Sequence, residues 1–165
     1  MATKKGIVVT VVILAAITGA SCLVWLIPQD IENKIIISDF KAHLDNIKEI
    51  RFALQTEVDQ EFQNMLNGKI NSTEYIEIAE ASSSQVNSQI IQLVESKAPE
   101  EWHKSYLNYI ESLKKFNSQI RETIVVAKIM SESNESGKIQ DILEKIDLLK
   151  KDSESLAIAS DNTRP

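Results

Sequence analysis

The sequence predicts an all-α protein, with an N-terminal transmembrane helix followed by an antiparallel up-and-down four-helix bundle. Three observations support this fold. The 165 residues include only four Gly and three Pro, too few turn-forming residues for a fold of many short strands. Residues 6–27 form an unbroken, uncharged apolar run. The rest of the chain carries apolar residues three and four positions apart, which is the period of amphipathic helices.

The first element is a membrane anchor over residues 6–28. As a helix, its apolar run reaches roughly 33 Å, close to the thickness of the hydrocarbon layer of a bilayer. Lys4 and Lys5 precede the run, and Asp30 is the first charge after it. The positive-inside rule therefore places residues 1–5 in the cytoplasm as a short tip.

This topology predicts a single-pass protein of the cell membrane, with the N-terminus cytoplasmic and the C-terminal domain outside. Residues 6–27 would contact membrane lipid. Residues 29–160 would form the extracytoplasmic helical bundle, and residues 161–165 a frayed tail, because chain ends pack poorly unless they are tied down.

The anchor contains three further candidate features. A face of small residues would let two membrane helices approach closely. Alternatively, the Lys-Lys-Gly sequence before the apolar run is similar to the signal of pilin-like subunits, which are cleaved after a glycine, here Gly6. Lipidation of Cys22 is a weaker alternative to its packing as a small apolar residue. The small residues of the face are Ala15, Ala16, Gly19 and Ala20.

Four amphipathic helices are expected outside the membrane. The first runs from about residue 30 to Asn67, where Gly68 favours a helix end. The second begins at Asn71 or Ser72, and the third after Pro99, which suits a first helical position. The third helix continues to about residue 130, a polar loop covers residues 131–137, and a fourth helix follows from about residue 139.

Each expected helix has an apolar stripe that would face the core. The middle of the second helix is weakly apolar, because Ser82, Ser83 and Ser84 lie there together with the small Ala79 and Ala81. We interpret this stretch as a thin, close helix contact, with a polar pocket as the alternative. The stripes are Ile36, Phe40, Leu44, Ile47, Leu54, Val58, Phe62 and Met65; Tyr75, Ala79, Val86, Ile90 and Leu93; Trp102, Tyr106, Tyr109, Leu113, Phe116, Ile120, Ala127 and Met130; and Ile139, Ile142, Leu143, Ile146, Leu149 and Leu156.

The charge balance argues against nucleic acid as a partner. The whole chain has a net charge of −6, and leaving out Lys4 and Lys5 brings the outer part to −8. Phosphate backbones are bound by clustered Lys and Arg, which an acidic surface does not provide.

No catalytic, cofactor or metal site is expected. Glu100 and His103 have the spacing of half a di-iron motif, but the only other histidine, His43, lacks a Glu three residues earlier. Cys22, the single cysteine, lies within the expected membrane span and so is no accessible nucleophile. Gly-rich phosphate loops and nucleophile elbows are also missing, which favours a non-enzymatic role.

Two N-glycosylation sequons fall in expected loops outside the membrane. Asn71 is followed by Ser72 and Thr73, and Asn134 precedes Glu135 and Ser136. Both asparagines are candidate modification sites. Asn71 is also well placed as a helix N-cap.

The anchor segment LAAITGASCLVWLIPQ, residues 14–29, resembles those of uncharacterised small single-span archaeal membrane proteins with a helical extracytoplasmic domain. This resemblance implies no function. The layout is also similar to the sensory part of chemotaxis receptors and histidine kinases, although those chains return through the membrane to a signalling domain and this one ends at Pro165.

We therefore expect an interaction or structural subunit of a membrane or envelope assembly. Its partner would be another membrane or envelope protein, or a second copy of the chain. The alternatives are a ligand-sensing four-helix domain that acts through a partner, and a pilin-like secreted subunit.

Overall fold

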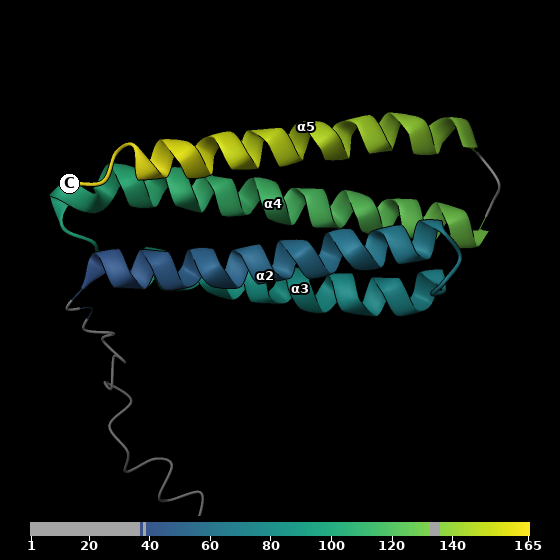
Figure 1. Ribbon diagram of the computed structural model, residues 1–165, viewed down its shortest axis with the longest axis horizontal. Coiled ribbons are helices and arrows are strands. Elements are labelled where there is room, and N and C mark those ends of the chain that lie inside the picture. Colours follow the sequence, from purple (N-terminus) through teal and green to yellow (C-terminus); the bar gives the residue numbers. More distant parts are fainter. Residues whose placement is uncertain (1–36, 38, 133–135) are drawn as a thin grey trace, which may run out of the picture. The chain divides into compact units, whose positions relative to one another are not determined.

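The computed structural model describes residue 37 and residues 39–132 and 136–165. This part of the chain contains four helices and no strand: α2 (Phe40–Leu66), α3 (Ser72–Glu95), α4 (Glu100–Glu132) and α5 (Ser136–Asp161). Successive helices run antiparallel, so the C-terminus lies at the same end as the start of α2 (Figure 1). The predicted all-α class and the four-helix bundle are confirmed.

The predicted transmembrane helix at residues 6–28 lies outside the described residues, as do the cleavage position after Gly6 and the small-residue face of Ala15, Ala16, Gly19 and Ala20. Among the helices that the structure does describe, none combines the length and apolar character needed to cross a bilayer.

The first helix of the bundle begins later than predicted. Its N-cap is Asp39, whose extended backbone precedes the helix and whose carboxylate accepts a hydrogen bond from the Ala42 amide at 2.9 Å. Capping by a short acidic side chain satisfies an amide that would otherwise lack a partner, and so fixes the start of the helix. The predicted start of this helix at about residue 30 is therefore wrong, because the helix begins at Phe40.

The predicted end of this helix is confirmed at Asn67 and Gly68. Gly68 has φ +69°, in the left-handed region that glycine enters without steric cost. The amide of Lys69 donates to the Asn64 carbonyl at 2.8 Å, and the Gly68 amide donates to the Met65 carbonyl at 3.0 Å. These two hydrogen bonds form a Schellman motif that closes α2 and starts the turn toward α3.

The α4–α5 connection and the C-terminal tail both differ from prediction. Ser131 still belongs to α4, where its hydroxyl donates to the Lys128 carbonyl at 2.8 Å, and α5 already begins at Ser136. The tail was expected to fray. Instead, the Thr163 hydroxyl donates to the Ala159 carbonyl at 2.8 Å, and Arg164 pairs with Asp45 of α2. Side-chain contacts thus tie the last turn to the bundle.

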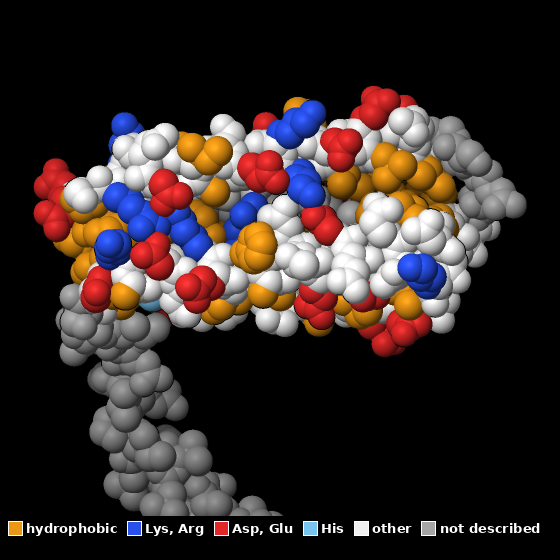
Figure 2. All heavy atoms as spheres, viewed as in Figure 1, with side chains coloured by type: hydrophobic (Ala, Val, Ile, Leu, Met, Phe, Trp, Pro, Cys, Tyr) orange, Lys and Arg blue, Asp and Glu red, His pale blue; other side chains and the backbone are white. Residues whose placement is uncertain are grey.

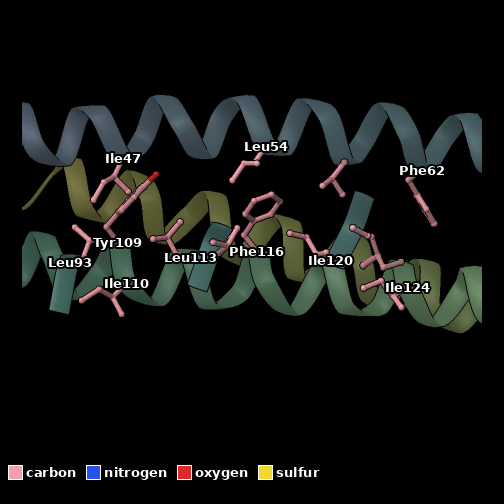
Figure 3. Close-up of a cluster of buried hydrophobic side chains, with 14 of the residues drawn as sticks. Ile47, Leu54, Phe62, Leu93, Tyr109, Ile110, Leu113, Phe116, Ile120 and Ile124 are labelled. Carbon is pink, nitrogen blue, oxygen red and sulfur yellow. The ribbon is translucent and has the colours of Figure 1, made fainter. Parts of the chain in front are cut away.

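Helix α4 is the central helix of the core. Aromatic and branched side chains on one of its sides meet α2 and α3, as predicted (Figure 3). Trp102 and Met130, also placed in the predicted stripe, lie at its ends and are only partly buried or exposed. The fully buried members on α4 include Leu113, Phe116 and Ile120.

The opposite side of α4 packs against α5 through small polar residues. The Ser112 hydroxyl donates to the Ser153 carbonyl at 2.7 Å, and the Ser153 hydroxyl donates back to the Ser112 carbonyl at 2.8 Å. One heptad away, the Ser105 hydroxyl donates to the Ser160 carbonyl at 2.9 Å. All four serines are fully buried. Hydroxyls that bond directly to the facing backbone require the two helices to approach closely.

Candidate functional site

The first and last helices of the bundle, α2 and α5, leave a groove between them. In the described part of the chain, no Cα atom of α2 comes within 8 Å of one of α5, whereas the helices adjacent in sequence do approach this closely. Long charged side chains bridge the gap instead. Figure 2 shows Lys and Arg side chains gathered along this seam with acidic side chains around them. We call this feature the α2–α5 groove.

Three bridges cross the groove. Arg164, which follows the C-terminal end of α5, pairs with Asp45 at 2.6 Å, and Lys150 pairs with Asp59 at 2.7 Å. Lys48 pairs with Asp161, which also lies 2.9 Å from Arg164. These side chains are partly exposed, so solvent screens each pair and we expect each to contribute no more than about 1 kcal/mol.

A pocket of about 400 Å³ opens between the bridges, which we call the Arg51 pocket. Residues from three helices line it: Lys48, Glu49, Arg51 and Phe52 of α2, Tyr109 of α4, and Ala157 and Asp161 of α5. The pocket combines two cations, two carboxylates and apolar surface from Phe52 and Ala157. A small organic molecule with both a charged and an apolar part matches this lining.

Arg51 is the unusual residue of this pocket. It is 9% exposed and lies in the core stripe between Ile47 and Leu54. Its Nη2 donates to the Ser153 hydroxyl at 2.9 Å, and its guanidinium carbon lies 5.4 Å from the centre of the Phe116 ring. Its Nε is buried without a hydrogen-bond partner. Among the residues that the structure describes, no carboxylate pairs with this buried cation.

Tyr109 forms the floor of the pocket. It reaches from α4 toward α2, with its hydroxyl at the tip of the side chain (Figure 3). The Lys48 ammonium lies 5.3 Å from the centre of its ring. Burial raises the pKa of Tyr109, whereas the positive charge of Arg51 acts in the opposite direction. Tyr109 is therefore a neutral hydrogen-bonding group at physiological pH.

A second pocket of about 450 Å³ lies farther along the groove. Gln119 of α4 is buried at its base, donating to Asp59 at 3.4 Å and leaving its own Oε1 without a partner. Its lining is Asp59, Phe62, Gln63, Leu66, Gln119, Leu143, Ile146, Asp147 and Lys150. The Asp59–Lys150 pair lies on the side of this pocket nearer to Arg51. The α2–α5 groove thus contains two separate recesses.

The predicted site residues lie elsewhere. Asn71 is exposed and caps α3, its side-chain oxygen accepting from the Glu74 amide at 2.9 Å. The cap role is confirmed, and Asn71 remains a candidate glycosylation site beside a shallow polar depression. Asn134 lies outside the described residues. Glu100 and His103 are exposed on the first turn of α4. Within the described ranges, no three His, Cys, Asp or Glu side chains gather as metal ligands would.

The serine-rich middle of α3 forms a polar helix contact. The Ser83 hydroxyl donates to Asn117 of α4 at 2.6 Å, and Asn117 donates to Asn87 at 2.7 Å. Ser82 is buried and donates to the Ile78 carbonyl of its own helix. This hydrogen-bonded layer agrees with the prediction of a close contact at Ser82–Ser84.

Sequence reasoning missed Arg51 because the helix stripe was traced through apolar residues alone. A charged residue at an interior position of such a stripe is the signal that identifies it. Comparisons with models of known protein families, with curated proteins and with solved structures find no match to this chain. The candidate site is therefore inferred from its geometry alone.

Proposed function

We propose that the protein is a non-enzymatic interaction or structural subunit of a membrane or envelope assembly. In this proposal the apolar run at residues 6–27 anchors the chain, and the bundle faces the outside of the cell. The apolar length of that run and the lysines before it support this placement.

Exposed apolar side chains at one end of the bundle support the interaction role. Ile91 and Val94, three residues apart, share a face of α3, and Leu107 lies in the second turn of α4. All three are more than half exposed. Because α3 and α4 are joined at this end, the three residues lie at the same end of the bundle. Apolar surface of this kind favours contact with another protein.

The test is a native mass spectrum of the full chain purified from native membranes in mild detergent. We expect foreign subunits or further copies in fixed stoichiometry. The variant V94Q/L107Q should lose them, because it replaces apolar contact surface with amides. L148Q is the matched control, since Leu148 is 60% exposed but lies on α5. A monomeric wild-type protein, or the same subunits retained by V94Q/L107Q, would contradict the proposal.

A second candidate function, ligand sensing through a partner, is favoured by the α2–α5 groove. A ligand in the Arg51 pocket would contact residues of both the first and last helices of the bundle. Ligand binding would therefore change the relative stability of conformations in which α2 and α5 lie closer together or farther apart, as a sensor requires. A neighbouring protein in contact with the bundle could respond to this change in helix spacing.

A further inference from the structure

We propose that the Arg51 pocket binds a small organic monocarboxylate with a short apolar body, whose carboxylate pairs with Arg51. This inference rests on the second candidate function, ligand sensing, and names its class of ligand. It does not depend on which protein the outer surface contacts.

The charge of Arg51 is uncompensated by any carboxylate among the described residues. Burying a guanidinium is costly unless an anion or several hydrogen bonds compensate it. Arg164 has two carboxylate partners, whereas Arg51 has none among the described residues and makes one hydrogen bond, to the neutral Ser153. A ligand carboxylate would supply the missing charge, and it matches the planar fork of donors that a guanidinium presents.

The charged residues that line the pocket limit the number of negative charges that a ligand can carry. Lys48 is already paired with Asp161, so Arg51 is the cation left for a ligand. Glu49 and Asp161 also line the pocket and repel additional negative charge. A group with a single negative charge is therefore favoured over a dicarboxylate or a phosphate.

The apolar lining and the size of the pocket indicate the body of the ligand. Phe52, 72% exposed, and Ala157 offer apolar surface from opposite sides of the groove. The Tyr109 hydroxyl is a neutral group at the floor of the pocket. The volume of about 400 Å³ lies at the lower end of the range of about 300–1,000 Å³ for small-molecule pockets. A compact acid with one aromatic ring or a short branched chain fits these dimensions.

The test uses the full chain in detergent micelles and two probes, benzoate and 4-methylpentanoate. Their uncharged amides, benzamide and 4-methylpentanamide, are the matched ligand controls. Binding is measured by calorimetry and by the NMR signals of the arginine Nε–H groups. The chain has three arginines, Arg51, Arg121 and Arg164, so the Arg51 signal is assigned by its loss in R51M.

We expect at least one acid to bind saturably and to move the Arg51 Nε–H signal, with the amide at least about tenfold weaker. R51M should weaken acid binding at least about tenfold. R121M removes the same charge from an exposed position of α4 and should leave binding unchanged. Phe52→Ala should weaken binding a few-fold without unfolding the bundle, because Phe52 is mostly exposed. This second variant keeps the test valid if R51M does not fold.

Three results would overturn the proposal. The first is the absence of saturable binding by either acid up to about 10 mM, a concentration at which even weak specific binding is detected. The second is equal binding of acid and amide in the pocket, which would reject the carboxylate class but leave ligand sensing intact. The third is acid binding that survives in a folded R51M, or in F52A without any loss of affinity.

Discussion

Replacing Ser112 with leucine should separate α4 from α5. The Ser112 hydroxyl is fully buried, 2.7 Å from the Ser153 carbonyl and 3.3 Å from the Ser153 hydroxyl. Leucine removes a buried hydrogen bond, worth about 1 kcal/mol. It also forces two extra heavy atoms between two helices in direct contact, which costs about 1–3 kcal/mol. The expected loss is about 2–4 kcal/mol, a large part of the 5–15 kcal/mol that stabilises a typical domain.

Thermal unfolding of the full chain, followed by circular dichroism in mild detergent, measures this loss. For a bundle of this size about 1 kcal/mol corresponds to roughly 4 °C, so S112L should melt about 8–16 °C below wild type. S112A loses only the hydrogen bond and should melt about 4 °C lower. Ser118 is exposed on the same helix, and S118L should change the melting temperature by less than about 2 °C. An S112L protein that melts within about 2 °C of wild type would refute close packing along this serine seam.

Three further substitutions test other parts of the fold. Gly68 has φ +69° with open space around it, so G68A should lose about 1 kcal/mol of stability from backbone strain alone, and G68N should lose less. Thermal unfolding measures both losses, and equal losses in the two variants would contradict backbone strain as the cause. Phe116→Ala should cost about 3–5 kcal/mol because the ring is fully buried, whereas Phe52→Ala, the exposed control, should cost less than about 1 kcal/mol. Burial lowers the pKa of His43 below 6.5, so the unfolded chain binds a proton at this residue more readily than the folded chain does. The stability that the neutral His43 contributes is therefore complete above pH 6.5 and is lost as the pH falls toward the pKa of His43 in the folded state. The melting temperature should therefore fall less in H43Q than in wild type between about pH 7.5 and 5.5, and an unchanged slope in H43Q would show that another group is responsible.

Local sequence signals predict most of the helix ends in the described residues. Asn67 and Gly68 end α2 as predicted, and Asn71 caps α3, because capping depends on a few neighbouring residues and one backbone conformation. The start of α2 was misplaced because the apolar stripe extends beyond the true boundary, and Ile36 was counted in it. Asp39, a good capping residue inside that stripe, was the overlooked signal.

The candidate site was harder to predict, because it depends on how distant helices are aligned. Tracing the stripe through Ile47 and Leu54 passes over Arg51, which occupies the interior position between them. A search for charged residues at such positions finds Arg51 from the sequence alone. It does not find Ser153 or Phe116, since these come from other helices and meet Arg51 only in the folded register.

The same reasoning explains why the serines of α4 and α5 were overlooked. Ser105 and Ser112 are seven residues apart, as are Ser153 and Ser160, so each pair keeps one face of its helix. Serines with this spacing are equally compatible with a buried and with an exposed helix face. Only the position of the neighbouring helix backbone in the folded protein distinguishes these two cases. The close α4–α5 contact fixes Ser153 in place, and the Ser153 hydroxyl accepts from Arg51 while it donates to the Ser112 carbonyl. Widening that seam should therefore also displace Arg51, so S112L should weaken carboxylate binding even though Ser112 does not line the pocket.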